Sequence, residues 1–245
     1  MSVIQPTRLL AKCVPRYIGC CVSSRGVGSV PDFTAAHLAD KGYWDRRYGG
    51  QRGTFDWLAD GDCTLEYVLP YVKHGARVLD MGCGTSSFAV KLCKTCPVPV
   101  HVVCLDFSVE GLKSTQDMFE EAFSTDLMND FSVHFVQADA TKTPFKANMF
   151  DVILDKGTTD SVLKLDDEEK ALSMAKKILD ESLRLLSGGG VYIQITDEDP
   201  DLRMLLLNDL LFKGCNKNNV SISHRKISEE DSWEYFMYVL SINKE

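Results

Sequence analysis

The stretch 76–92, ARVLDMGCGTSSFAVKL, decides the fold of this chain. An apolar run over residues 77–81 predicts a short buried strand, and the pattern of residues 85–94 predicts a helix directly after it. Between the two lie Gly82 and Gly84, which remove the side chains at a strand-to-helix turn. A tight bend alone explains one glycine, so the second indicates that a ligand comes close to the backbone.

The same strand-and-helix unit recurs along the rest of the chain. Further strands are predicted over 100–106, 132–139, 150–155 and 191–196. Further helices are predicted over 108–123, with Ser108 as its N-cap, and over 167–186 and 199–212. Two final strands, 219–227 and 232–242, are joined by a short acidic turn, which allows only an antiparallel pair. Because β-α-β connections are right-handed, the earlier strands form a parallel sheet with helices on both faces. We therefore predict the α/β class, with a doubly wound, mostly parallel, seven-stranded sheet and an antiparallel C-terminal strand pair.

Four successive predicted strands end in an aspartate, at Asp80, Asp106, Asp139 and Asp155. In such sheets a ligand binds at the carboxyl ends of the strands, so these carboxylates are expected around one polar rim. An aspartate at such a position also caps the helix that follows, and one or two of the four are expected to do only that.

The sequence of the glycine turn argues against two classes of ligand. Its sequence GCGTSS has Ser87 where a dinucleotide-binding turn has its third glycine, and no Lys-Ser or Lys-Thr pair follows, as a phosphate-binding loop requires. A carboxylate at Asp106 can hold both hydroxyls of a ribose, and Asp139 can accept from an adenine amino group. S-adenosylmethionine contains adenine and ribose but no pyrophosphate that the turn would have to bind. We therefore predict it as the cofactor.

Composition narrows the classes of partner. The 245-residue chain has a formal net charge of −8, which argues against nucleic acid. It contains no apolar run near the ~20 residues that span a bilayer, so we predict no membrane partner. Nine cysteines lack disulfide-like spacing, which suits a reducing compartment. Cys93 and Cys96 form a lone C-x-x-C without the two further ligands that zinc needs, so we predict no metal.

The first 31 residues differ from the rest in charge. They contain no acidic residue and four basic ones, Arg8, Lys12, Arg16 and Arg25. A basic, serine-containing start with interleaved apolar residues resembles a mitochondrial transit peptide, and a basic tail without a targeting role is the alternative. We predict a transit peptide over 1–31 and a single domain over 32–245.

Several quoted motifs resemble those of one enzyme family. Four of them are similar to the successive motifs of the seven-strand, S-adenosylmethionine-dependent methyltransferases: VLDMGCGTSS (78–87), CLDFS (104–108), VQADAT (136–141) and FDVILDKGTTD (150–160). The motifs DKGTTD (155–160), YWDRRY (43–48) and FDW (55–57) resemble a narrower set that methylates lysine in proteins. QITDEDPDLR (194–203), together with the basic leader, resembles the mitochondrial members that act on citrate synthase.

The resemblance implies roles for the matching residues. Gly82 and Gly84 would let the backbone approach the methionine part of the cofactor, and Asp80 would orient its amino group. Asp106 would hold the ribose. The adenine would be contacted by Phe107, Asp139 and Ala140.

The segment before the sheet would close over the methionine end. Trp44 and Tyr48, one helical turn apart, resemble this lid, with Arg47 meeting the cofactor's carboxylate and Phe55 completing the cover. Without the resemblance, the same spacing of Trp44 and Tyr48 is typical of a core-facing stripe.

On the acceptor side, Lys156 resembles the lysine that this subfamily places beside the cofactor. We expect Asp155 to orient the incoming ammonium and the acidic run 197–199 to attract it. Because nearby carboxylates raise a lysine's pKa, we assign them to docking and leave the base unassigned. The turn DKGT replaces the N-P-P-Y type of turn used for planar nitrogens, which favours an sp³ amine.

The predicted partner is therefore a protein lysine, with citrate synthase in the mitochondrial matrix as the substrate that the resemblance implies. Other readings stay open at this point: another mitochondrial protein such as an elongation factor, a small-molecule amine, or a non-catalytic cofactor-binding module. A nicotinamide oxidoreductase is disfavoured by the missing third glycine.

Overall fold

The computed structural model describes residues 37–50, 55–124, 131–212, 219–227 and 234–242. The predicted transit peptide and the acidic turn between the last two strands lie outside these residues.

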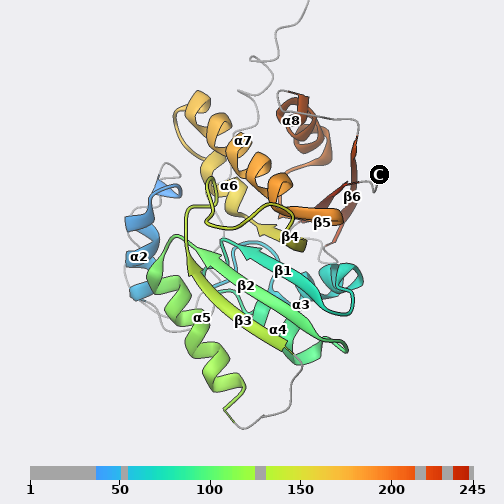
Figure 1. The fold of residues 1–245 in the computed structure, drawn as a ribbon. Coiled ribbons are helices and arrows are strands. Elements are labelled where there is room, and N and C mark those ends of the chain that lie inside the picture. The colour runs from blue at the N-terminus through green and yellow to red at the C-terminus, as the bar shows by residue number, and fades with distance from the viewer. Residues whose placement is uncertain (1–36, 51–54, 125–130, 213–218, 228–233, 243–245) are drawn as a thin grey trace, which may run out of the picture.

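One seven-stranded sheet runs through the molecule, in the order β3-β2-β1-β4-β5-β7-β6 (Figure 1). Its strands are β1 (Ala76–Met81), β2 (Val100–Asp106), β3 (Phe131–Gln137), β4 (Phe150–Lys156), β5 (Leu186–Thr196), β6 (Val220–Lys226) and β7 (Phe236–Ile242). Strands β1 to β5 pair in parallel, and β7 pairs antiparallel with both β5 and β6. The predicted fold class and the antiparallel C-terminal pair are confirmed.

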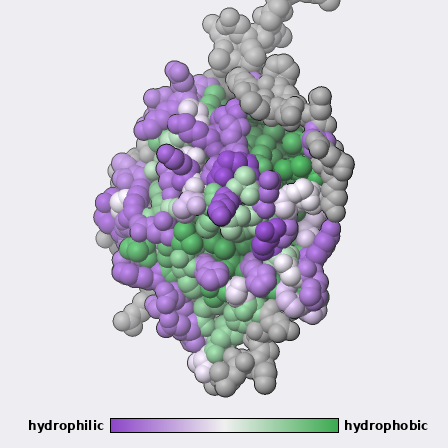
Figure 2. Space-filling model, in the orientation of Figure 1, coloured by the Kyte–Doolittle hydropathy of each residue, from purple (hydrophilic) through white to green (hydrophobic). Residues whose placement is uncertain are grey.

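Helices cover both faces of the sheet (Figure 1). In the same orientation, Figure 2 shows hydrophobic residues at the surface between hydrophilic ones. One face carries α3 (Gly61–Val68), α4 (Phe88–Thr95) and α5 (Val109–Ala122), and the other carries α6 (Thr158–Leu163), α7 (Glu168–Leu185) and α8 (Pro200–Phe212). The remaining helix α2 (Lys41–Gly49) packs beside α5. Because successive strand residues point to opposite faces, Val78 of β1 belongs to one apolar core and Leu79 to the other.

Two element boundaries differ from the sequence prediction. Helix α4 begins at Phe88, because the hydroxyl of Thr85 accepts the backbone N–H of Phe55 at 2.9 Å and keeps this residue in the preceding turn. Strand β5 begins at Leu186 rather than Val191, and its register against β4 shifts between Phe150 and Val152. Helix α7 therefore ends before the glycines at 188–190, which lie in the irregular first part of the strand.

The end of β3 and the start of α6 also differ. Asp139 lies two residues beyond β3, in a turn closed by a bridge to Lys142. The short helix α6 follows β4 directly and was not predicted, since six residues are too few for a periodic pattern. The N-cap predicted at Ser108 is confirmed, because its hydroxyl accepts the N–H of Gly111 at 3.2 Å.

The strand order fixes where a ligand can bind. From β1 the chain moves outward through β2 to β3, and then crosses to β4 on the other side of β1. The carboxyl ends of β1, β2 and β4 therefore meet at the point where the strand order reverses, which is the usual ligand site of such sheets.

Candidate cofactor site

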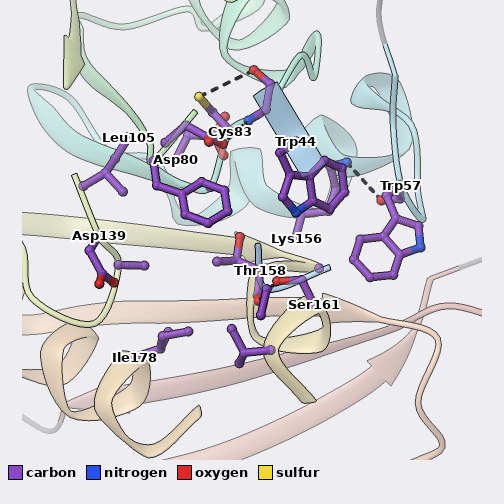
Figure 3. A pocket seen from close by; sticks show the side chains of 18 of the residues that line it. Trp44, Trp57, Asp80, Cys83, Leu105, Asp139, Lys156, Thr158, Ser161 and Ile178 are labelled. Carbon is purple, nitrogen blue, oxygen red and sulfur yellow. Dashed lines mark hydrogen bonds between the residues drawn. The ribbon is translucent and has the colours of Figure 1, made fainter. Parts of the chain in front are cut away.

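A cavity of about 1010 Å³, including its open mouth, lies at this switch point (Figure 3). Its lining includes most of the residues singled out in the sequence: Trp44, Tyr48, Phe55, Asp80, Gly82, Gly84, Asp106, Phe107, Asp139, Ala140 and Lys156. Arg47 and Asp155 are the two candidates that do not line it.

Two features of the structure favour glycine in this turn: the backbone conformation and the close approach of other side chains. Gly82 and Gly84 both have positive φ, +74° and +52°, which favours glycine. A Cβ on Gly82 would overlap the hydroxyl of Thr158, and a Cβ on Gly84 would lie 2.6 Å from the hydroxyl oxygen of Tyr48. The interpretation that a ligand alone requires these glycines is therefore incomplete, because side chains of the chain itself use the space.

Asp80 is a buried carboxylate at the floor of the cavity. Its Oδ2 has no hydrogen-bond partner among the described residues. Burial raises the pKa of Asp80 to about 7, against the opposing effect of the Lys156 charge. A buried carboxylate oxygen without a donor is costly, and a ligand ammonium beside it would remove that cost.

Asp106 connects the cavity to the backbone around it. Its Oδ2 accepts the N–H of Gly84 at 2.8 Å, and its Oδ1 accepts the N–H of Ser108 at 2.7 Å. Burial raises the pKa of Asp106 to about 6, although these backbone bonds oppose the shift. Since each carboxylate oxygen can accept more than one hydrogen bond, Asp106 keeps capacity for ligand hydroxyls.

The side of the cavity near Asp139 is more apolar. Asp139 uses one oxygen, Oδ1, to accept the backbone N–H and the hydroxyl of Thr141, both at 2.7 Å. The walls around it are formed by Leu105, Phe107, Ala140, Val162, Met174 and Ile178. In Figure 3, Asp139 and Trp57 lie at opposite sides of the cavity. The cavity therefore has an apolar half near Asp139 and an aromatic half near Trp57.

The aromatic half is built from α2 and the segment before α3. The rings of Trp44 and Tyr48 stack with centroids 5.3 Å apart, and Trp57 lies 6.2 Å from Trp44. The indole N–H of Trp44 donates to the carbonyl of Leu38 at 2.7 Å, which fixes the ring. These aromatics therefore line the cavity and are also held in the core, so both readings of their spacing apply.

Arg47 lies behind this aromatic wall rather than in the cavity. Its guanidinium carbon lies 4.0 Å from the centroid of the Phe55 ring, a cation–π contact. The sequence predicted a direct contact between Arg47 and a ligand carboxylate, whereas the structure places Arg47 against Phe55, which does line the cavity.

Lys156 forms a nearly buried ion pair that the sequence did not predict. Its Nζ lies 2.9 Å from Oδ1 of Asp56 and 3.2 Å from the carbonyl oxygen of Trp57. The pair joins the end of β4 to the FDW segment, and Figure 3 shows Lys156 near Trp44 and Trp57. The sequence pointed to this segment only through the motif FDW (55–57), and that motif did not indicate a role for Asp56.

Asp155 corrects a sequence-based expectation. It was expected beside the acceptor amine, but it is 1% exposed and lies outside the cavity lining. Its oxygens accept from the backbone N–H groups of Thr158 and Thr159, from the hydroxyls of Thr159 and Tyr192, and from the amide of Gln194. Because side chains alternate along a strand, Lys156 faces the cavity and Asp155 points away, where it holds the start of α6.

The acidic run 197–199 also lies outside the lining, after the end of β5. Burial raises the pKa values of Asp197 and Glu198. Behind them, the fully buried Arg203 of α8 pairs with Asp160 of α6, and it also donates to the hydroxyl of Thr196 at 3.0 Å. This run therefore follows the end of β5 and lies next to a buried ion pair, outside the cavity lining.

Comparisons with known proteins agree with this geometry. Residues 72–243 match the family model described as "Methyltransferase domain". The citrate synthase-lysine N-methyltransferase of Danio rerio is 30% identical over 84% of each chain, and the human protein of that name is 36% identical over 68% of this chain and 74% of its own. A SAM-dependent methyltransferase of Methanosarcina mazei shares the fold, with a TM-score of 0.53 at 16% identity over 78% of this chain and all of that one.

The family fits the chemistry of the residues in the cavity. Asp80 offers a buried carboxylate oxygen for an ammonium, and Asp106 offers acceptors for hydroxyls. On the side of Asp139 the lining includes the apolar side chains of Leu105 and Ile178 (Figure 3). The cofactor is S-adenosylmethionine. Among the described residues, no helix is long and apolar enough to cross a membrane. The chain therefore belongs to the seven-strand, S-adenosylmethionine-dependent methyltransferases, within the family of the protein-lysine methyltransferases.

Proposed function

We propose that this chain transfers methyl groups from S-adenosylmethionine to the side-chain amine of a lysine in a protein, with mitochondrial citrate synthase as the substrate. The observation that carries the substrate is the similarity to citrate synthase-lysine methyltransferases over most of the chain. The turn after β4 supports an sp³ amine, because Gly157 has a left-handed φ of +82° and leads into α6 without a prolyl turn.

We further propose how the cavity residues hold the cofactor. Asp80 takes the ammonium, and Asp106 takes the ribose hydroxyls. The adenine lies against Phe107, with Asp139 and Ala140 at its edge. The geometry of these residues, with an unpaired carboxylate oxygen at one end and an apolar wall at the other, supports this orientation.

The aromatic half of the cavity then covers the reacting end. Trp44, Tyr48 and Phe55 exclude water, and Arg47 acts by holding Phe55. Lys156 and Asp56 fix the FDW segment over the end of β4. Asp155 acts through α6, whose first residue Thr158 packs against Gly82.

When bound, S-adenosylmethionine supplies a methyl group on a positively charged sulfur. The chain's own residues align the amine with that methyl group and keep the site dry. The lysine must arrive as a neutral amine although its ordinary pKa is ~10.4. The acidic run 197–199 attracts the ammonium form at the edge of the site, and its proton passes to solvent.

We propose the mitochondrial matrix as the location, with residues 1–31 as a transit peptide and 32–245 as the catalytic domain. The basic, acid-free composition of residues 1–31 and the mitochondrial names of the relatives support this. Fluorescent fusions with and without residues 1–31 test it, because only the longer fusion should enter mitochondria.

Incubation of residues 32–245 with radiolabelled S-adenosylmethionine and purified citrate synthase tests the activity. We expect label on one lysine, located by peptide mass spectrometry, and loss of label in Asp106→Ala. Cofactor binding without label on citrate synthase would contradict the substrate, and a matrix extract or a lysine-containing elongation factor would be tested next. An absence of cofactor binding would contradict the enzyme itself.

A further inference from the structure

Helix α2 rests on the first turn of α5 through two contacts that have the same spacing on both helices. The hydroxyl of Ser108 donates to Oδ1 of Asp45 at 2.6 Å. One turn further along each helix, Tyr48 packs on Gly111, where a Cβ would lie 3.1 Å from the ring carbons Cδ2 and Cε2. Residues three apart lie on the same face of a helix, so the two contacts form one continuous seam.

Ser108 is the junction of this seam with the cofactor site. Its hydroxyl gives its single hydrogen to Asp45 and accepts the N–H of Gly111, which makes it the N-cap of α5. Its backbone N–H donates to Asp106, whose other oxygen holds the N–H of Gly84. Ser108 is fully buried, whereas the side chain of Asp45 is 28% exposed, so loss of the Asp45 carboxylate leaves the buried hydroxyl without this partner.

Tyr48 packs between two glycines, Gly84 and Gly111. Its hydroxyl lies over Gly84 and its ring over Gly111, while Thr115 of α5 donates to the carbonyl of Gly84 at 2.8 Å. Tyr48 and its stacked neighbour Trp44 both line the cavity. The position of α2 along this seam therefore sets the position of the aromatic wall.

We propose that Asp45 is a positioning residue for the cofactor: its bond to Ser108 holds α2 so that Tyr48 and Trp44 form the aromatic wall of the cavity. The inference rests on the proposed placement of S-adenosylmethionine in this cavity. Asp45 does not itself line the cavity, so it acts through the helix that carries it.

The two oxygens of Asp45 have different partners, which allows a matched control. Oδ1 accepts from Ser108, and Oδ2 pairs with Lys41 on the same helix. The ion pair with Lys41 is exposed and is expected to contribute little, whereas a carboxylate that accepts from a buried hydroxyl forms a charge-assisted bond. Lys41→Ala therefore removes a partner of Asp45 without touching the seam.

The test measures binding of S-adenosylmethionine by isothermal titration calorimetry to the full chain and to variants. We expect Asp45→Ala and Ser108→Ala each to weaken binding by about tenfold. The double variant should be no weaker than the weaker single variant, because both remove the same bond. Asp45→Asn keeps the acceptor oxygen and should recover most of the affinity, and Lys41→Ala should bind like the wild type.

A second readout separates positioning from a general structural role. Asp45→Ala removes this bond with or without cofactor, so thermal unfolding without cofactor should shift down slightly, whereas the stabilisation by added cofactor should shrink markedly. The KM for S-adenosylmethionine should rise more than kcat falls. Additive losses in the double variant, or wild-type affinity of Asp45→Ala, would overturn the inference, and so would a stabilisation by added cofactor equal to that of the wild type.

Asp106→Asn distinguishes this inference from the cofactor placement on which it rests. Weakened binding in Asp106→Asn beside normal binding in Asp45→Ala would overturn the positioning role alone. Normal binding in Asp106→Asn would overturn the proposed placement, and the inference with it.

Discussion

The side chain of Thr158 fills the space that a Cβ on Gly82 would occupy, and its hydroxyl donates to the carbonyl of Met81 at 2.7 Å. The first residue of α6 is thus locked to the glycine turn after β1. This contact couples the two strand ends that form the floor of the cavity, because Gly82 follows β1 and Thr158 follows β4.

Substitution of Gly82 tests this coupling. We expect Gly82→Ala to lower the free energy of unfolding by about 3 kcal/mol, through a strained φ and the overlap with Thr158. Gly75→Ala is the matched control, because Gly75 has a similar φ of +71° but open space around its Cβ position. It should lose only about 1 kcal/mol. Equal losses in chemical denaturation would show that backbone strain alone requires Gly82.

The buried carboxylates predict opposite pH trends for stability and cofactor binding. Burial raises the pKa of Asp80 to about 7 and that of Asp106 to about 6, above the ordinary value of 3.8. The folded state therefore binds more protons than the unfolded state between pH 4 and about 7, so this contribution to stability is lost as the pH rises through that range. Cofactor binding needs the ionised carboxylates and should weaken as the pH falls below about 7.

Thermal unfolding and calorimetric titration between pH 5.5 and 8.5 measure both trends on one protein. Asp80→Asn should flatten the stability trend, raise the stability without cofactor at pH 8 and weaken binding at every pH. Cofactor affinity in the wild type that stays constant from pH 8 to 5.5 would show that neither carboxylate contacts the cofactor as an anion.

The ion pair between Lys156 and Asp56 predicts a non-additive double variant. Their side chains are 7% and 14% exposed, so removal of one leaves the other charge poorly compensated. We expect Lys156→Met to cost about 3 kcal/mol of unfolding free energy, and Asp56→Asn/Lys156→Met to recover much of it. Methyl transfer should stay low in the double variant, since the FDW segment loses its tie to β4. Recovery of activity together with stability would assign the pair a purely structural role.

Asp155 is predicted to act through α6 rather than on the substrate. Asp155→Asn should lower the free energy of unfolding by about 2 kcal/mol, because the amide nitrogen faces the hydroxyl of Tyr192 and the amide of Gln194. Turnover should fall, while the KM for the protein substrate and cofactor affinity change little. Tyr192→Phe, which removes one donor to the same oxygen, should show the same pattern more weakly. A large rise in the KM for the protein substrate alone would instead place Asp155 at the acceptor amine.

Much of the fold followed from local pattern. Short stretches, in which apolar spacing and single capping residues decide the structure, encode the five parallel strands, the four predicted helices, the glycine turn and the cap at Ser108. The rim of candidate residues also followed, because the carboxyl ends of parallel strands meet at one edge whatever the details of packing. All candidates except Arg47, Asp155 and the acidic run 197–199 line the cavity for this reason.

Tertiary structure decided what those residues contact. The side-chain alternation of β4 turned Asp155 away from the cavity, and the packing of Arg47 on Phe55 moved it behind the wall. The partners of Gly82, Lys156 and Asp45 lie far away in the sequence, at Thr158, Asp56 and Ser108. A sequence pattern records the period of an element and the chemistry of each residue, but contacts between distant segments arise only when the sheet brings them together.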